Sequence, residues 1–163
     1  MNSCIEKQDC ICKKYNSIPK EFVSELEIRD SRKSIKLSLK NSENTIAVIL
    51  DDCLITKDIR CDALFLFEGT KKISFLVELK GFGEIEKAFK QLSYTKQREE
   101  YKKIVECFKG LDDKKVYQKC FIITNGKLDN SKKEKFENKY KIRVVQVLVS
   151  DAIKPIPDLR KYL

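Results

Sequence analysis

Two apolar strands with a short turn between them are encoded by residues 60–81, which read RCDALFLFEGTKKISFLVELKG. The second strand ends in Glu78-Leu79-Lys80. Alternation along a strand puts Glu78 and Lys80 on the face of Leu76, where a half-buried strand usually carries apolar side chains. Ionisable groups in such a place are costly unless they pair or bind a metal.

The first strand carries one acid, Asp62, on the face that also carries Leu64 and Leu66. If the two strands are neighbours, Asp62 lies beside Glu78. We expect the two carboxylates to come within about 4 to 6 Å of each other, close enough to share one cation. Asp62 and Glu78 on opposite faces of the sheet would remove this expectation.

The length of 163 residues fits a single domain, with residues 1–17 as an N-terminal extension and residues 151–163 as an extended C-terminal tail. A hydrophobic content of 42% favours a globular chain. No apolar run reaches the roughly 18 to 20 residues that span a bilayer, and the N-terminus lacks the pattern of a signal peptide. We therefore expect a cytoplasmic protein without a membrane partner.

The charge balance is strongly basic, with 34 Lys and Arg against 25 Asp and Glu and a net charge of +9. Such an excess favours a polyanionic partner, nucleic acid first and an anionic membrane surface second. A Lys-rich proteome would give a similar balance without any ligand.

The seven cysteines are dispersed without paired Cys-x-x-Cys spacing, which is typical of reduced thiols in a cytosol. The spacing of Cys4, Cys10 and Cys12 fits a metal cluster poorly. The other four lie in or near apolar segments and are expected to behave as small core residues: Cys53, Cys61, Cys107 and Cys120.

The coarse order of elements is helix, strands, long helix, strand, helix, strand, which indicates an α/β fold with one mixed sheet flanked by helices. A three- or four-stranded antiparallel meander comes first, and the long helix is expected to kink near Lys96 and to stop at Gly110. The last strand is continuously apolar, which predicts a buried position. The expected helices cover residues 19–28, 84–109 and 131–140, and the expected strands cover residues 35–39, 45–50, 60–67, 73–80, 116–124 and 142–149.

An Asp in one strand, Glu-x-Lys in the next and a Gln in the following helix resemble the signature of the PD-(D/E)xK nuclease superfamily. In this chain the signature corresponds to Asp62, Glu78, Lys80 and Gln91, with Cys61 where the family name has Pro. The resemblance in element order covers residues 18–150 and implies a restriction-endonuclease-like core.

The resemblance implies an enzyme that hydrolyses phosphodiester bonds with Mg²⁺ or Mn²⁺, an endonuclease rather than an exonuclease, with DNA favoured over RNA. Asp62, Glu78 and the backbone carbonyl of Leu79 form a partial oxygen shell for such a cation, and Glu25 is the candidate for an additional carboxylate. Lys80 is placed to orient the attacking water. The chain has no His, so a metal-activated hydroxide replaces an imidazole base.

The long helix carries a polar stripe on which Gln91 borders the carboxylates and Lys87 and Arg98 are candidate phosphate contacts. An ordinary solvated face is the alternative for this stripe. Glu27 is a second candidate for the extra carboxylate, and Asp51 and Asp52 are expected in a hairpin turn.

Three alternatives to the nuclease stay open. The acids and the Lys can form a self-satisfied buried ion pair. The chain can be an inactive module that binds nucleic acid or a partner protein. It can also be a basic domain that acts at a membrane surface. For an active enzyme the small size favours structure-directed or nonspecific cleavage, and dimeric resolvases of this fold make a homodimer a further expectation.

Overall fold

The computed structural model describes residues 4–5, 10–15, 25–30, 33–40, 43–51, 53–55, 59–111 and 114–163, with the backbone alone for residues 11–15. Its main feature is a six-stranded mixed sheet in the order β1-β4-β5-β6-β7-β8. These strands are β1 (Ile11–Tyr15), β4 (Asn44–Ile49), β5 (Ala63–Glu68), β6 (Lys72–Leu79), β7 (Val116–Thr124) and β8 (Gln146–Val149).

Adjacent strands are antiparallel from β1 to β6 and parallel from β6 to β8. The antiparallel meander predicted from the sequence is confirmed as β4-β5-β6. Each parallel pair requires a helical crossover. The crossovers are α1 (Ile85–Gln97) with α2 (Glu99–Lys109), and α3 (Asn130–Tyr140).

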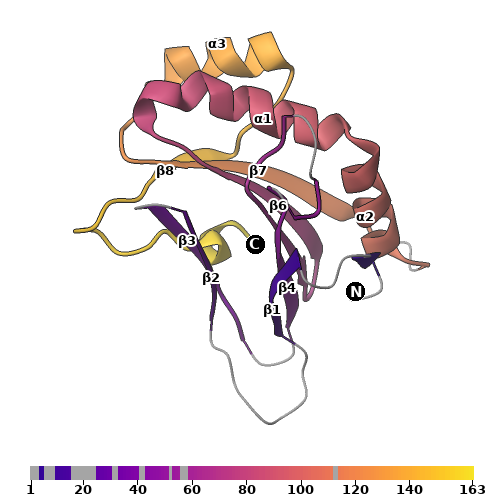
Figure 1. Ribbon diagram of the computed structural model, residues 1–163. Coiled ribbons are helices and arrows are strands. Elements are labelled where there is room, and N and C mark those ends of the chain that lie inside the picture. Colours follow the sequence, from indigo (N-terminus) through magenta and orange to yellow (C-terminus); the bar gives the residue numbers. More distant parts are fainter. Residues whose placement is uncertain are drawn as a thin grey trace.

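The two faces of the sheet are covered by different structures (Figure 1). Helices α1 and α2 pack on the face that carries Leu64, Leu66 and Leu76. The opposite face, which carries Phe65 and Phe75, packs against β2 (Glu25–Asp30), β3 (Lys33–Ser38) and the C-terminal η4 (Leu159–Tyr162). The fold is therefore α/β with a mixed sheet, as predicted, but its helices lie on one face.

The helix predicted for residues 19–28 is wrong where the structure describes it, because Glu25 to Asp30 form strand β2. Leu26 and Ile28 are buried while Glu25 and Glu27 point outward, so the period of two prevails over the helical period. Among the described residues, strand β2 pairs with β3 alone, as a separate two-stranded sheet. The remaining residues of that predicted helix lie outside the described part of the chain.

The long helix divides where a kink was predicted. Arg98 adopts an extended conformation, with φ −70 and ψ 144, between α1 and α2. The apolar stripe of the first half of the predicted long helix is displaced from that of the second half. The break at Arg98 lets both stripes face the sheet. Gly110, at φ 70, ends α2 as predicted.

Both ends of the chain are more structured than predicted. Residues 11–15 form edge strand β1, and residues 158–163 pack under the sheet instead of leaving as an extended tail. Asp158 accepts hydrogen bonds from Ser38, and the Arg160 guanidinium pairs with Glu43. Leu159 is fully buried.

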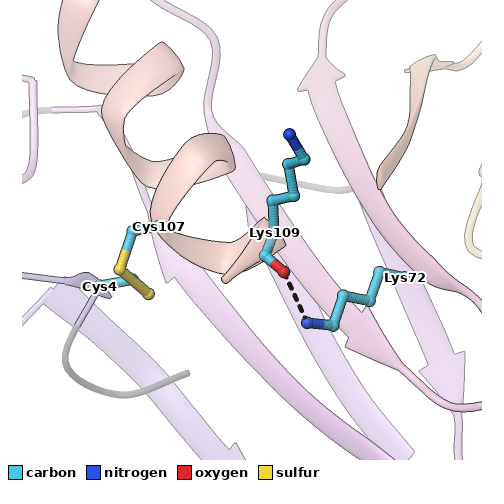
Figure 2. The surroundings of a disulfide bond; sticks show 4 residues. All are labelled: Cys4, Lys72, Cys107 and Lys109. Carbon is cyan, nitrogen blue, oxygen red and sulfur yellow. Dashed lines mark hydrogen bonds between the residues drawn. A yellow bond between two sulfur atoms is a disulfide. The ribbon is translucent and has the colours of Figure 1, made fainter. Parts of the chain in front are cut away.

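The expectation of reduced thiols is wrong for four of the cysteines. Disulfide bonds join Cys4 to Cys107 and Cys10 to Cys53, and a shared metal cluster of Cys4 and Cys10 is thereby ruled out. Figure 2 shows the first of them beside the end of α2, where buried Lys72 donates a hydrogen bond of 2.9 Å to the Lys109 carbonyl. A cation at this place is favourable because a helix C-terminus carries partial negative charge.

Cys61 and Cys120, the other two cysteines whose side chains the structure describes, are free and buried, as core residues should be. The last strand also departs from its prediction. It begins at Gln146 and lies at the sheet edge with half-exposed side chains, while Ile142 and Val144, before it, are buried.

Candidate active site

Glu78 lies near the carboxyl end of β6, the strand at which the sheet changes from antiparallel to parallel pairing. Its side chain shares the helix-covered face with Leu76 and is 0% exposed. Neither carboxylate oxygen has a hydrogen-bond partner among the described residues. A buried acid in this state is costly, and a ligand that supplies positive charge would remove the cost.

Asp62 occupies the bend that leads into β5. The antiparallel register pairs Ala63 with Val77, so Asp62 stands opposite Glu78. Its Oδ2 atom accepts a hydrogen bond of 2.6 Å from the Leu79 backbone N–H, which fixes the carboxylate against β6. The register thus brings Asp62 next to Glu78, and the charge of Asp62 acts on Glu78. The expected separation of about 4 to 6 Å between the two carboxylates stays a prediction.

The environment raises the pKa of both acids. Burial raises the pKa of Asp62 to about 6, against a smaller opposing effect of the Leu79 N–H. Burial, and then the charge of Asp62, raises the pKa of Glu78 to about 9. At neutral pH the metal-free protein therefore keeps a proton on Glu78, which is the behaviour of two carboxyl groups crowded into one apolar site.

Lys80 connects these acids to the surface. Its Nζ atom lies 3.1 Å from Oε1 of Glu78, and its side chain is 19% exposed. This contact is an ion pair, and the ammonium charge opposes the rise of the Glu78 pKa without reversing it. Burial is the largest single effect and lowers the pKa of Lys80, but the contact with Glu78 and the charge of Asp62 together outweigh it, so the net shift is upward. Lys80 therefore stays an ammonium group.

A cleft of about 520 Å³ opens beside Lys80. Its lining is rich in cations, and its single acid, Asp51, forms an ion pair with Arg60. Gln91 donates from Nε2 to the Arg60 carbonyl at 2.7 Å, while its buried Oε1 has no hydrogen-bond partner in the described structure. The lining residues are Asp51, Ile59, Arg60, Lys80, Lys87, Lys90 and Gln91.

Two of the residues predicted on the long helix reach this region, and one does not. Gln91 and Lys87 line the cleft with Lys80, as expected. Arg98 is outside the cleft lining, in the break between α1 and α2, where it pairs with Glu100.

The two candidates for an extra carboxylate, Glu25 and Glu27, form ion pairs on the small two-stranded sheet. Glu25 pairs with Lys36 on the small two-stranded sheet, and Glu27 pairs with Arg29. Glu25 stands at the opposite end of six-residue β2 from Asp30, roughly 16 Å away at the usual rise of a strand. The charge of Asp30, rather than of Glu25, acts on Asp62 and raises its pKa.

Sequence reasoning missed Arg60, Lys90 and Asp30, and it placed Asp51 only in a turn. Lys90 stands three residues after Lys87 and next to Gln91, so a helical projection could have found it. Arg60 and Asp30 come to the site through tertiary contacts alone. Asp52 lies outside the described residues.

The donor set fits a hard divalent cation. Within the described ranges no three His, Cys, Asp or Glu side chains gather closely enough to hold a metal by themselves. A cation would therefore use Asp62 and Glu78 together with the Leu79 carbonyl and water, a mixture of oxygen donors that Mg²⁺ commonly accepts. The unpartnered oxygens of Glu78 are the observation that favours this set.

Comparisons with known proteins give no relative: no family model, no curated protein and no solved structure matches this chain. Among the described residues, the helices are all too short or too polar to cross a bilayer.

Proposed function

We propose that this protein is a metal-dependent nuclease with a restriction-endonuclease-like core. The observation that carries the proposal is Glu78, fully buried without a hydrogen-bond partner, facing Asp62 and joined through Lys80 to a cationic cleft. The PD-(D/E)xK signature in the sequence agrees with this arrangement. Perturbed acids next to a cleft are typical of catalytic sites.

The cleft suits a phosphodiester backbone. Arg60, Lys87 and Lys90 line it together with Lys80, and phosphate oxygens are the ligands that such side chains bind best. Lys80 lines the cleft and forms an ion pair with Glu78, so a strand bound in the cleft would bring a phosphate close to the acids. DNA is proposed ahead of RNA, and internal cleavage ahead of end-directed cleavage, because the sequence resembles that family.

In the reaction, a water oxygen forms a bond to phosphorus, the bond from phosphorus to one sugar oxygen breaks, and the departing sugar oxygen gains a proton. Asp62 and Glu78, with the Leu79 carbonyl, would hold Mg²⁺ or Mn²⁺. The bound cation supplies an acidified water and positive charge for the phosphoryl oxygens. Lys80 keeps its proton, orients the water and offsets the negative charge that develops on the phosphate. Gln91 positions the Arg60 backbone at the cleft wall.

The test is a cleavage assay with linear, circular, branched and single-stranded DNA and with RNA, in Mg²⁺, Mn²⁺ or EDTA. Wild-type protein should cut with metal only. Asp62→Ala and Glu78→Ala should each abolish cleavage, and Lys80→Ala should reduce it severely. Lys119→Ala is the matched control, because Lys119 is a half-buried lysine on the other sheet face.

Three outcomes would overturn the proposal. The first is wild-type protein that cuts none of the substrates with either metal, and binding without cleavage in that case would favour the inactive module. The second is a set of Asp62, Glu78 and Lys80 variants that cut as fast as wild type. Cleavage that persists in EDTA would also contradict a cation held by these acids.

A further inference from the structure

The outer side of α1 carries an exposed aromatic ring next to the cationic cleft. Tyr94 is 48% exposed, although its neighbours Leu92, Ser93 and Thr95 are buried. Its ring lies under the ammonium of Lys90, with Nζ at 5.7 Å from the ring centroid. Lys90 also lines the cleft, so one side chain belongs both to the phosphate-binding wall and to the aromatic surface.

The helical spacing explains why these groups gather. Lys87, Lys90, Gln91 and Tyr94 follow the i, i+3, i+4, i+7 pattern, which places them on one stripe of a helix. Tyr94 stands one turn beyond Lys90, a rise of roughly 6 Å. A polynucleotide with a phosphate in the cleft therefore has a base within reach of the Tyr94 ring.

We propose that Tyr94 is a base-stacking platform and that the cleft takes a single-stranded segment of polynucleotide. This inference rests on the proposed nuclease function and specifies its substrate. A base in a duplex is already stacked between its neighbours and cannot lie on a protein ring. An unpaired base can, and every base offers a face to an aromatic side chain, so the contact is tolerant of sequence. The cation at Lys90 strengthens such a site because it attracts both the ring and a phosphate.

A second tyrosine in the chain supplies a matched control. Tyr117 is 43% exposed and has Lys115 over its ring at 5.3 Å, so its local surroundings resemble those of Tyr94. It lies at the start of β7, paired with Ile73, whereas the site lies at the far end of the same strands beside Leu79. Tyr117 thus has the ring and the cation without the cleft.

The experiment measures binding in the Glu78→Gln background with EDTA, so that cleavage does not interfere. The probes are a labelled single-stranded DNA, the same sequence as RNA, and the blunt DNA duplex. The single strands should bind more tightly than the duplex at equal salt. The comparison of single-stranded DNA with RNA shows which polynucleotide is preferred. Tyr94→Ala should weaken single-strand binding by about tenfold and leave duplex binding within about twofold.

Two further variants separate stacking from other causes. Tyr94→Phe should restore the affinity, because stacking needs the ring and not the hydroxyl. Tyr94→Ala should leave the slope of log affinity against log salt unchanged, because a stacked base releases no counterions, while Lys90→Ala should reduce it by about one. Tyr117→Ala should have no effect on either quantity.

The inference is overturned if the duplex binds as tightly as the single strands. It is also overturned if Tyr94→Ala weakens the affinity for single strands and for the duplex equally, or if Tyr117→Ala weakens single-strand binding as much as Tyr94→Ala does. Any of these results, combined with metal-dependent cleavage by wild-type protein, leaves the nuclease in place. Absence of cleavage in wild-type protein removes the proposed function itself, so the two failures are distinguishable.

Discussion

Replacement of Glu78 by glutamine should stabilise the metal-free protein, and the gain should grow with pH. The ordinary pKa of this group, 4.5, is raised to about 9 by burial and by the charge of Asp62. Between these values the folded protein holds a proton that the unfolded chain has released, so the stability contributed by this group falls as pH rises. Below pH 4.5 both states hold the proton and the penalty vanishes.

The size of the effect follows from the shift. Each unit of pKa difference corresponds to about 1.4 kcal/mol, so a group that ordinarily titrates near 4.5 carries a penalty of about 3 kcal/mol at pH 7. Glutamine keeps the shape and removes the titration. Lys80 loses a neighbour, but its side chain is 19% exposed and reaches water. We therefore expect a net gain of about 1 to 3 kcal/mol at pH 7.

The assay is urea unfolding of both proteins in EDTA, with the disulfides in the same state, from about pH 5 to about pH 8. Glu137→Gln is the control for a buried glutamate. Glu137 is also buried, but it accepts a hydrogen bond of 2.7 Å from the Val144 N–H and pairs with Arg143 at 3.1 Å, so its loss should destabilise. Equal destabilisation by both variants, or a Glu78→Gln gain that is constant over this pH range, would refute the reasoning.

Mg²⁺ should raise the unfolding temperature of wild-type protein and of Lys80→Ala, and EDTA should reverse the rise, since a ligand of the folded state stabilises it. Loss of this response in Lys80→Ala would contradict a cation held by the acids. Lys87→Ala should lower the slope of log affinity against log salt for nucleic acid by about one, whereas Arg98→Ala, outside the cleft, should not change it. A reduced slope for Arg98→Ala with an unchanged slope for Lys87→Ala would place the nucleic-acid-binding surface outside the cleft. Breakage of the Cys10–Cys53 disulfide by Cys53→Ser, across a separation of 43 residues, should lower the unfolding free energy by up to about 4 kcal/mol. An unchanged urea midpoint would contradict this estimate.

The central part of the fold could be predicted because its signals are local. Strands β5 and β6 are nearly continuous apolar runs, and the turn between them is short, so the pairing of Asp62 with Glu78 followed from register alone. Strand β2 was mistaken for a helix because its four alternating residues follow a stretch with helical spacing. Strand β1 has no local signal, since its pairing with β4 comes from distant residues.

The candidate site could be predicted only where its residues share an element. Glu78 and Lys80 come from one strand, and Lys87 and Gln91 come from one helix. The contribution of Arg60 depends on a loop fixed by Gln91, and that of Asp30 depends on how the small sheet sits against the large one. Cys4 and Cys107 are separated by 103 residues, and no spacing rule joins cysteines at such a distance.

The docked C-terminal segment has a consequence for the order in which the chain folds. Hydrogen bonds tie Ser34 to Ser150 and Ser38 to Asp158, across 116 and 120 residues. During synthesis the strands β2 and β3 emerge long before these partners, and the sheet face beneath them stays open until Ser150 and Asp158 have been added. Contacts of such long range also slow folding, because the chain must close a large loop before it gains them. A nascent chain stalled before Asp158 should therefore expose the apolar face around Phe65 and Phe75, and would bind chaperones rather than reach the folded state.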